Sequence, residues 1–358
     1  MKILIVLPNN SHGGAEQYLK MVGSQFKEKD LTIVFLKKGD SHFWDELKEH
    51  STQKHYSVKS ELKGFIKFAF NHLFGRSKSY DLVFTSHVYV NGLMGFLMRL
   101  NRIKANQFIA RESTSIFLRY KGFGRLLYQM MYRFGYQKIN LLICQTELMK
   151  DQLIKHLPYL EKRMHIKVIP NPIDLDAITK SAKEQLSLPT ESPYIVSAGR
   201  LITEKGFDIL INAFNKIKKE HHSLKLVILG EGKLKEDLIH LVKELHLDDD
   251  VIFEGHVHNV YPYFKHAKLC VVSSRIEGFP NVLLQMMSQN NSVVSTLCAG
   301  GIESIPGIIT APSNHECALK DAIIESLNRT NSGDNRTLFD DYLKSRDVKQ
   351  FIKSITTS

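Results

Sequence analysis

The chain has 358 residues, which is too long for one ordinary hydrophobic core and fits two domains of roughly 150–180 residues each. Hydrophobic residues make up 43% of the chain and charged residues 24%, which are globular proportions and exclude wholesale disorder. No run of about 18 apolar residues occurs, so a membrane-spanning helix is excluded. The apolar stretch at the start is too short for a signal peptide, so we expect a cytoplasmic protein.

The charge is unevenly distributed along the chain. Residues 1–170 hold 27 basic and 13 acidic residues, a net charge of +14, whereas residues 171–358 hold 21 and 24, a net charge of −3. This asymmetry suggests that the first half faces an anionic surface, either phospholipid or nucleic acid. No known nucleic-acid-binding pattern accompanies the charge, which favours phospholipid.

The four cysteines show no CxxC spacing that would indicate a metal or redox site. Cys144 and Cys270 lie within apolar runs, which predicts buried thiols in a reducing compartment.

The first half alternates short β-rich runs with helical patterns. Strands are predicted over residues 2–7, 31–36, 81–85, 107–110, 141–144 and 166–169, with helices beginning near residues 15, 60, 90, 123 and 147. Continuous apolar strands separated by amphipathic helices indicate βαβ units and a parallel sheet covered on both faces.

The second half repeats this pattern. Strands are predicted over residues 194–197, 224–229, 251–253, 269–272 and 293–295, with helices beginning near residues 207, 233, 259, 281 and 315. Between the halves, Pro170 and Pro172 flank one residue and predict an extended connector. We therefore expect two doubly wound α/β domains, 1–170 and 171–340, and a helical tail over 341–358 that returns to the first domain. Ligands would bind at the carboxyl ends of the strands.

Gly13 and Gly14 follow the first predicted strand at the start of a helix. Two glycines let the backbone approach a ligand closely, and a helix N-terminus offers unpaired N–H groups to an anion. The pair is not GxGxxG, so a dinucleotide site is weakly supported and a plain tight turn remains the alternative.

Cationic side chains follow the first strand of the second half. Gly199 and Arg200 close this strand and Lys205 precedes the next helix. Two cations five residues apart on such a loop could clamp a diphosphate, although Lys and Arg on loops are usually only solvated.

The segment from Ser273 to Gln285, which contains Glu277, begins where the strand over 269–272 ends. Asn281 is a plausible N-cap for the helix that follows, and Gln285 would lie one turn into it. Helical side chains lean toward the N-terminus, so the Gln285 amide would point back at the same pocket as Glu277.

Residues 277–284, EGFPNVLL, closely resemble the EGFPNVLLEA signature of the GT4-type retaining glycosyltransferases, which have the GT-B fold of two Rossmann-like domains facing each other across a cleft. Further similarity, in the family's order, covers most of the chain: Gly13-Gly14, residues 169–174, Gly199-Arg200 with Lys205-Gly206, Gly230-Glu231-Gly232, and Ser295-Thr296 with residues 300–303.

The resemblance implies transfer of a sugar from a nucleotide diphosphate donor to an acceptor, with retention at the anomeric carbon and without a metal or other cofactor. Arg200 and Lys205 would neutralise the leaving pyrophosphate and Glu277 would hold donor-sugar hydroxyls. The remaining donor-binding positions would be Gly13, Gly14, Gly199, Phe279, Pro280, Asn281, Val282 and Gln285. The Asp248-Asp249-Asp250 run is interpreted as a loop and not as a metal site.

Gln285 departs from the family, which usually has a second glutamate there. A glutamine oxygen still accepts from a ribose hydroxyl, but without charge assistance, at a loss of ~1 kcal/mol. The departure leaves two alternatives open: a non-catalytic nucleotide-sugar-binding relative or partner subunit, and a sugar-nucleotide epimerase.

His87 follows the strand over 81–85 and resembles the family histidine that contacts donor sugar or acceptor; a histidine that merely caps the strand is the alternative. Arg111 and Glu112 follow the next strand, where acceptor-side residues often lie, and Glu112 is a candidate for acceptor binding or proton removal.

Two stretches of the first half, residues 59–70 and 117–138, are both basic and aromatic. Such stretches suit a monotopic contact with anionic lipid, although their aromatic residues could simply pack under the sheet. With the resemblance, they predict peripheral association with the inner face of the plasma membrane and an undecaprenyl-diphosphate-linked saccharide acceptor.

Overall fold

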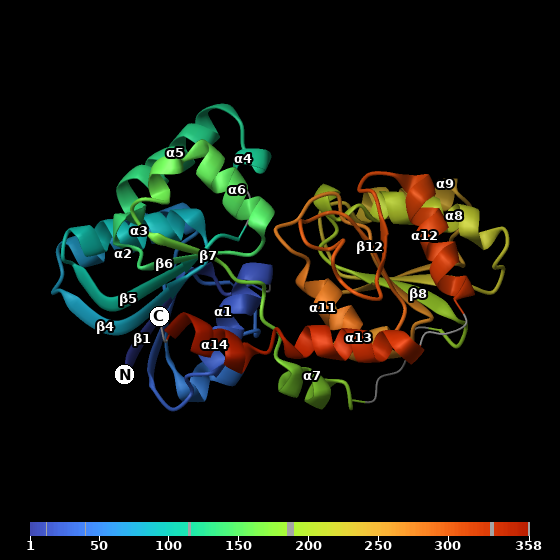
Figure 1. The fold of residues 1–358 in the computed structure, drawn as a ribbon, viewed down its shortest axis with the longest axis horizontal. Helices are drawn as coiled ribbons and strands as arrows, with labels where there is room; N and C mark the ends of the chain where they lie inside the picture. Colours follow the sequence, from blue (N-terminus) through green and yellow to red (C-terminus); the bar gives the residue numbers. More distant parts are fainter. Residues whose placement is uncertain (12, 40, 114–115, 185–189, 330–332, 357–358) are drawn as a thin grey trace. The chain divides into compact units, whose positions relative to one another are not determined.

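The computed structural model describes residues 1–11, 13–39, 41–113, 116–184, 190–329 and 333–356. The chain forms two compact units, residues 1–172 together with 348–358, and residues 173–347 (Figure 1). The sequence-based prediction places the domain boundaries at residues 170 and 340.

The first unit is built on a parallel sheet of seven strands among the described residues, in the order β3-β2-β1-β4-β5-β6-β7. The strands are β1 (Lys2–Asn9), β2 (Asp30–Lys37), β3 (Thr52–His55), β4 (Lys78–Thr85), β5 (Ile103–Arg111), β6 (Leu141–Cys144) and β7 (His165–Val168). The central strand β1 is buried over six consecutive residues, because helices cover both faces of the sheet.

Helices α2, α3, α5 and α6 pack on one face of this sheet, and α1 and α14 pack on the other. The helices are α1 (Gly14–Ser24), α2 (Glu61–Leu73), α3 (Val88–Arg99), α4 (Ile116–Arg119), α5 (Gly122–Gly135), α6 (Glu147–His156) and α14 (Val348–Thr356), with the 3₁₀ helices η1 (Asp45–His50), η2 (Tyr136–Lys138) and η3 (Pro158–Leu160).

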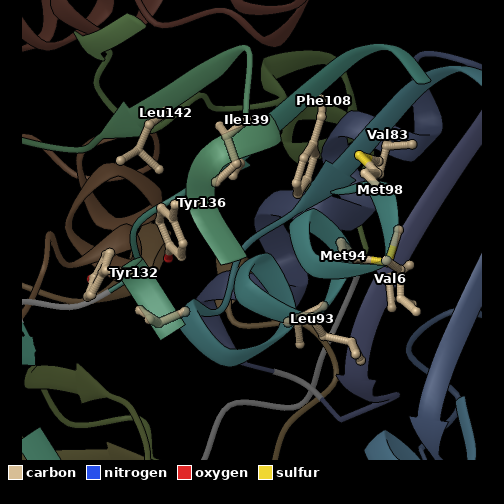
Figure 2. Close-up of a cluster of buried hydrophobic side chains, with 14 of the residues drawn as sticks. Val6, Val83, Leu93, Met94, Met98, Phe108, Tyr132, Tyr136, Ile139 and Leu142 are labelled. Atoms are coloured by element: carbon tan, nitrogen blue, oxygen red, sulfur yellow. The ribbon is translucent and has the colours of Figure 1, made fainter. Parts of the chain in front are cut away.

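The core between the sheet and α3 is apolar and almost completely buried. Leu93 and Met94 of α3 pack beside Val6 and Phe108 of the strands, and Tyr136 closes the same cluster (Figure 2). Burying a large apolar side chain contributes about 1.5–3 kcal/mol, so this cluster holds α3 and α5 firmly against the sheet.

The second unit contains a parallel sheet of six strands among the described residues, in the order β10-β9-β8-β11-β12-β13. The strands are β8 (Tyr194–Ala198), β9 (Lys225–Leu229), β10 (Val251–Gly255), β11 (Leu269–Val272), β12 (Val293–Thr296) and β13 (Ile309–Ala311). Helices α8, α9 and α12 pack on one face, and α7, α10, α11 and α13 pack on the other.

The helices of this unit are α7 (Leu175–Ser181), α8 (Phe207–Lys218), α9 (Lys235–Glu244), α10 (Tyr261–His266), α11 (Asn281–Met287), α12 (Glu316–Asn328) and α13 (Gly333–Lys344), with η4 (Thr203–Lys205). The prediction of two doubly wound α/β units is confirmed.

Of the strands and α-helices, β3, β13, α4 and α7 were not predicted, and α13 begins before the predicted helical tail at residue 341. The β3 sequence is polar and lies at the sheet edge, β13 has only three residues, and α7 begins directly after the proline-containing connector. Cys144 and Cys270 are free, buried thiols, as the apolar runs predict. No helix in the described part of the chain combines the length and apolarity needed to cross a bilayer.

Candidate functional site

In the second unit, several predicted site residues follow the carboxyl ends of β8 and β11. Gly199 and Arg200 come directly after β8, and Ser273 and Ser274 come directly after β11. Because β8 and β11 are neighbouring parallel strands, these loops meet at one edge of the sheet.

Lys205 and Glu277 form an ion pair at this edge. The Lys205 Nζ lies 2.8 Å from Glu277 Oε1, and the Ser274 hydroxyl donates to the same oxygen at 2.6 Å. The Lys205 and Glu277 side chains are 19% and 15% exposed, so the pair is shielded but still reachable from solvent. Charge-assisted hydrogen bonds of this kind fix the positions of both charged groups.

The backbone around Lys205 is anchored to the end of β11. The Ser273 hydroxyl donates to the Lys205 carbonyl oxygen at 3.0 Å. Gly206 has φ +63°, and a methyl group there would overlap the Ser273 carbonyl oxygen, so only glycine allows this close approach. The Lys205 side chain also lies against Gly199, which brings the two predicted positions together.

Arg275 holds the loop after β11 against the start of α8. Its guanidinium donates to both carboxylate oxygens of Asp208, at 2.8 and 2.6 Å, and to the Thr203 carbonyl oxygen at 2.8 Å. Burial alone would raise the pKa of the Asp208 carboxyl, but the hydrogen bonds from Arg275 outweigh it and lower that pKa. The positioning role of Arg275 was not predicted from the sequence, because its partner Asp208 lies 67 residues earlier in the chain.

Helix α11 and the two residues before it supply the remaining predicted donor residues of the second unit. The predicted N-cap at Asn281 is wrong: Pro280 is the N-cap, with extended backbone at φ −76° and ψ 101°, and Asn281 is the first helical residue. Phe279 and Pro280 are buried and Val282 is half-buried.

Gln285 lies in the second turn of α11. Its side-chain amide donates to the Tyr261 hydroxyl at 3.3 Å. Burial raises the pKa of Tyr261 to about 12, so this hydroxyl is protonated at neutral pH.

Arg200 differs from Lys205 in its surroundings. Its side chain is exposed, and within the described residues it makes no hydrogen bond or ion pair. The structure therefore brings Lys205, Glu277 and Gly199 together, with Arg200 at the same sheet edge but without contact to the Glu277 carboxylate.

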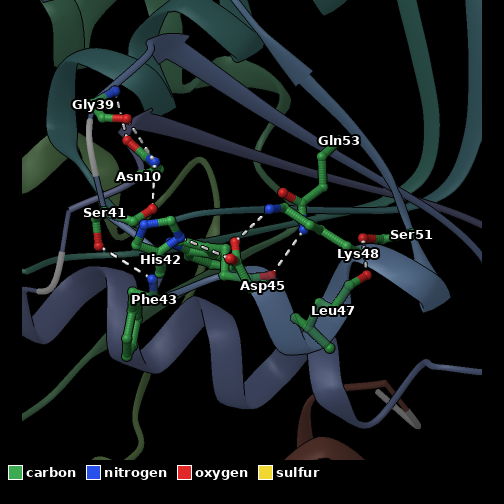
Figure 3. A network of polar contacts seen from close by, with 11 residues as sticks. Asn10, Gly39, Ser41, His42, Phe43, Asp45, Leu47, Lys48, Ser51 and Gln53 are labelled. Carbon is green, nitrogen blue, oxygen red and sulfur yellow. Dashed lines mark hydrogen bonds and ion pairs between the residues drawn. The ribbon is translucent and has the colours of Figure 1, made fainter. Parts of the chain in front are cut away.

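In the first unit, Gly13 is the N-cap of α1 and Gly14 is its first residue. Nearby, Asn10 ties the loops after β1 and β2 together (Figure 3). Its side chain donates to the carbonyl oxygens of Gly39 and Ser41, at 3.1 and 2.9 Å, and accepts from the Gly39 N–H at 2.7 Å. These bonds fix the loops at the edge where the two glycines lie.

His87 is the N-cap of α3, but its ring makes no capping hydrogen bond. Its Nε2 lies 3.5 Å from Glu16 Oε1, and its Nδ1 is buried without a hydrogen-bond partner among the described residues. Burial, with the nearby Arg111, lowers the pKa of His87 to about 4, so the imidazole is neutral at pH 7.

Arg111 is 2% exposed and reaches across the sheet edge to the connector. It donates to the Ser86 hydroxyl at 3.0 Å and to the Asn171 side-chain oxygen at 2.6 Å, and its guanidinium lies 4.3 Å from the Tyr18 ring centroid. Burial lowers the pKa of Arg111 to about 10, which still leaves it charged at pH 7. Asn171, between the two prolines, is a buried contact residue that sequence reasoning did not single out.

Glu112 directly follows β5 and points to the opposite face of the sheet from Arg111, toward the tyrosines of α5 and η2. It is 2% exposed, and its two oxygens accept from the hydroxyls of Tyr132 and Tyr136, both at 2.8 Å. Burial raises the pKa of Glu112 to about 7. Both carboxylate oxygens are thus occupied within the protein, which favours a positioning role for Glu112 over proton removal.

Replacing Glu112 with glutamine should change how stability depends on pH. Because the folded-state pKa is raised, Glu112 stabilises the fold fully below its ordinary value of 4.5, and this contribution is lost as pH rises toward 7. The unfolding free energy of Glu112→Gln minus that of the wild type should therefore rise by on the order of 1–3 kcal/mol as the pH is raised from 4.5 to 7. Denaturation at a series of pH values measures this; a pH-independent difference would contradict it. Glu28→Gln, at an exposed carboxyl of the same unit, is the control.

Two family models match the chain. Residues 12–177 match the model described as Glycosyltransferase Family 4, and residues 192–329 match the model described as Glycosyl transferases group 1. Each model covers most of one unit of the structure.

Curated relatives are similar over both units. The N-acetylgalactosamine-N,N'-diacetylbacillosaminyl-diphospho-undecaprenol 4-alpha-N-acetylgalactosaminyltransferase of Campylobacter jejuni is 27% identical over 312 residues, 86% of this chain and 83% of its own length. A glycosyltransferase of Methanocaldococcus jannaschii is 29% identical over 63% of this chain, but the match spans only 57% of that relative.

Solved structures share the fold. HepE of Anabaena, solved with UDP-glucose, has a TM-score of 0.80 at 17% identity and covers 100% of this chain and 98% of its own. The sucrose-phosphate synthase of Thermosynechococcus elongatus has a TM-score of 0.74 at 17% identity, covering 99% and 96%. With family models matched to both units, the chain belongs to the group 1 glycosyltransferases, and its two parallel-sheet units form the GT-B fold.

Proposed function

We propose that the protein is a retaining, metal-independent glycosyltransferase that moves a hexose or N-acetylhexosamine from a UDP- or GDP-sugar to a lipid-linked saccharide in surface polysaccharide synthesis. The observation that carries the proposal is the cluster of Lys205, Glu277 and Ser274 after the carboxyl ends of β8 and β11. A cation and a carboxylate held side by side suit a donor with an anionic leaving group and a hydroxyl-rich sugar.

Each group of the cluster has a distinct part in donor binding. Within the described residues, both polar contacts of the Glu277 carboxylate go to Oε1, so Oε2 is open to a sugar hydroxyl. The exposed Arg200 and the Lys205 ammonium would bind the diphosphate, and Gln285 would bind ribose hydroxyls.

In the proposed reaction, the bond between the anomeric carbon and the diphosphate oxygen breaks, and the acceptor oxygen bonds to that carbon on the same face of the sugar. The acceptor proton passes to the leaving phosphate oxygen. Charge grows on the diphosphate as its bond breaks, so cations fixed in advance stabilise the transition state more than the ground state.

The first unit would bind the acceptor. The neutral imidazole of His87 offers a hydrogen bond without adding charge. Gly13 and Gly14, at the start of α1, would instead let the backbone approach the donor closely. The name of the Campylobacter relative specifies an undecaprenol-linked acceptor, which supports a lipid-linked acceptor here. Such an acceptor would place the protein at the inner face of the plasma membrane.

A donor screen tests the proposal directly. The full chain is mixed with UDP- and GDP-sugars and its thermal stability recorded, because a ligand that binds only the folded state raises stability by mass action. Donors that bind are then labelled and offered with an undecaprenyl-diphosphate-linked saccharide. Sugar transfer supports the proposal. Binding without transfer to any acceptor supports the non-catalytic alternative, and conversion of the donor without acceptor supports an epimerase.

Gln285→Glu distinguishes a weakened donor site from an inactive one. A glutamate at this position could accept from the Tyr261 hydroxyl, where the glutamine amide donates to it, and would add charge assistance to ribose binding. We expect donor affinity to stay the same or to increase by up to about fivefold, or ~1 kcal/mol. Calorimetric titration of the donor measures this, with Gln289→Glu, just beyond α11, as the matched control. A large loss of affinity would assign the glutamine amide a role of its own.

A further inference from the structure

Helix α2 has apolar side chains on two faces, although only one face packs on the sheet. Phe65, Phe68 and Leu73 belong to the core on the inner side. Four more large apolar side chains recur every four residues along the outer side and are 57–75% exposed: Leu62, Ile66, Phe70 and Phe74. Core packing therefore accounts for the inner face, and among the described residues of this unit the outer stripe packs on no other helix or strand.

Helix α5 repeats this arrangement. Its inner side packs through Tyr128 and Tyr132 on the core. Its outer side carries five large apolar side chains at helical spacing that are 47–82% exposed: Phe123, Leu126, Leu127, Met130 and Phe134.

Helix α3 connects the two stripes, since it packs against both α2 and α5 on the same face of the sheet (Figure 1). It adds Phe96 and Leu100, which are also exposed. Eleven of the 16 large hydrophobic side chains that are exposed among the described residues thus lie on α2, α3, α5 and the residues that end them. We call this set the exposed apolar face.

The surroundings of the exposed apolar face are strongly basic. Residues 54–138 contain 15 basic residues and three acidic ones. The acidic three are engaged within the protein: Glu61 bonds to Asn9 and Tyr89, Asp81 to Asn106, and Glu112 to Tyr132 and Tyr136. Exposed cations flank the apolar stripes: Lys59, Lys63, Lys67, Arg76, Lys121 and Arg133.

We infer that the exposed apolar face docks on the surface of an anionic phospholipid bilayer, with α2 and α5 lying in the interface. The inference rests on the proposed function, which gives the protein a lipid-linked acceptor. Amphipathic helices with Phe and Leu on one side and Lys and Arg beside it insert their apolar side at the headgroup boundary and attract anionic lipid. A second copy of this chain is a poorer partner, because two such faces would bring the same excess of positive charge together.

The test measures binding of the full chain to vesicles of phosphatidylglycerol and phosphatidylcholine in equal parts, and to phosphatidylcholine vesicles alone. The wild type should sediment with the first and not with the second. The double variants Phe123→Asp with Leu127→Asp, and Ile66→Asp with Phe70→Asp, should each bind the anionic vesicles at least about tenfold more weakly. Leu338→Asp, at an exposed leucine of α13 in the other unit, should bind like the wild type.

Unchanged binding by both double variants, or no binding of the wild type to anionic vesicles, would overturn the inference. So would a wild-type dimer that the same variants dissociate without any vesicle binding. The thermal shift with nucleotide sugars should be the same in wild type and variants, because these positions lie outside the donor site. If no nucleotide sugar binds while the vesicle pattern holds, the proposed function fails and the docking surface stands.

Discussion

Lys205→Ala should lower kcat/KM for sugar transfer by roughly 10²–10³-fold, or ~3–4 kcal/mol of transition-state stabilisation. The ammonium is fixed 2.8 Å from Glu277 Oε1 and its backbone carbonyl is bound by Ser273, so it needs little reorganisation as charge grows on the leaving diphosphate. Alanine removes that charge and also leaves the shielded Glu277 carboxylate without its cation. Steady-state kinetics with the donor found in the screen measures the loss.

Lys216→Ala is the matched control, because Lys216 is an exposed lysine near the other end of α8. It pairs with a surface glutamate, Glu316, and contacts the thiol of the neighbouring Cys317. It should retain wild-type turnover. Thermal denaturation of both variants separates lost chemistry from lost folding. Wild-type kcat/KM in a folded Lys205→Ala protein would remove this lysine from the diphosphate site.

Gly95→Ala should destabilise the first unit by at least ~3 kcal/mol. Helices α3 and α5 pack so closely that a methyl group on Gly95 would overlap the carbonyl oxygen of Gly135. Neither backbone can rotate away as a side chain could. The helices must therefore separate, which loosens the buried contacts of Leu93 and Met94 with the sheet (Figure 2).

Gly124→Ala in α5 tests the same substitution where space is available. The added methyl group would meet only the Tyr120 ring, at 3.9 Å. Because alanine has a higher helix propensity than glycine, Gly124→Ala should leave the stability of the first unit unchanged or raise it by up to ~1 kcal/mol. Chemical denaturation of both variants gives the comparison, and equal stability of the two would show that α3 can move away from α5 at little cost.

The predicted strands could be identified because continuous apolar runs such as residues 2–7 leave few alternatives to a buried parallel strand. The same criterion fails for β3, whose TQKH sequence alternates between exposed and half-buried side chains at the sheet edge. It also fails for β13, which is too short to show a period.

The site residues that lie in recognisable local sequence motifs could be predicted. Lys205 and Glu277 belong to recognisable segments, and the parallel topology brings the ends of β8 and β11 together. Contacts that depend on distant residues were not predictable: the tyrosines that bind Glu112 lie 20 and 24 residues away, and Asn171 meets Arg111 across 60 residues. The start of α11 was misplaced by one residue because Pro280 accepts the extended N-cap geometry that Asn281 also favours.

Helix α14 has a consequence for how the protein acquires its structure during translation. It belongs to the first unit, where Phe351 packs edge-on against Tyr18 and Ile355 is buried. A ribosome synthesises all of residues 173–347 before it reaches this helix. The second unit can therefore fold while the first unit still lacks its last helix. Nascent chains halted before residue 348 would therefore expose the apolar patch around Tyr18 and offer it to chaperones.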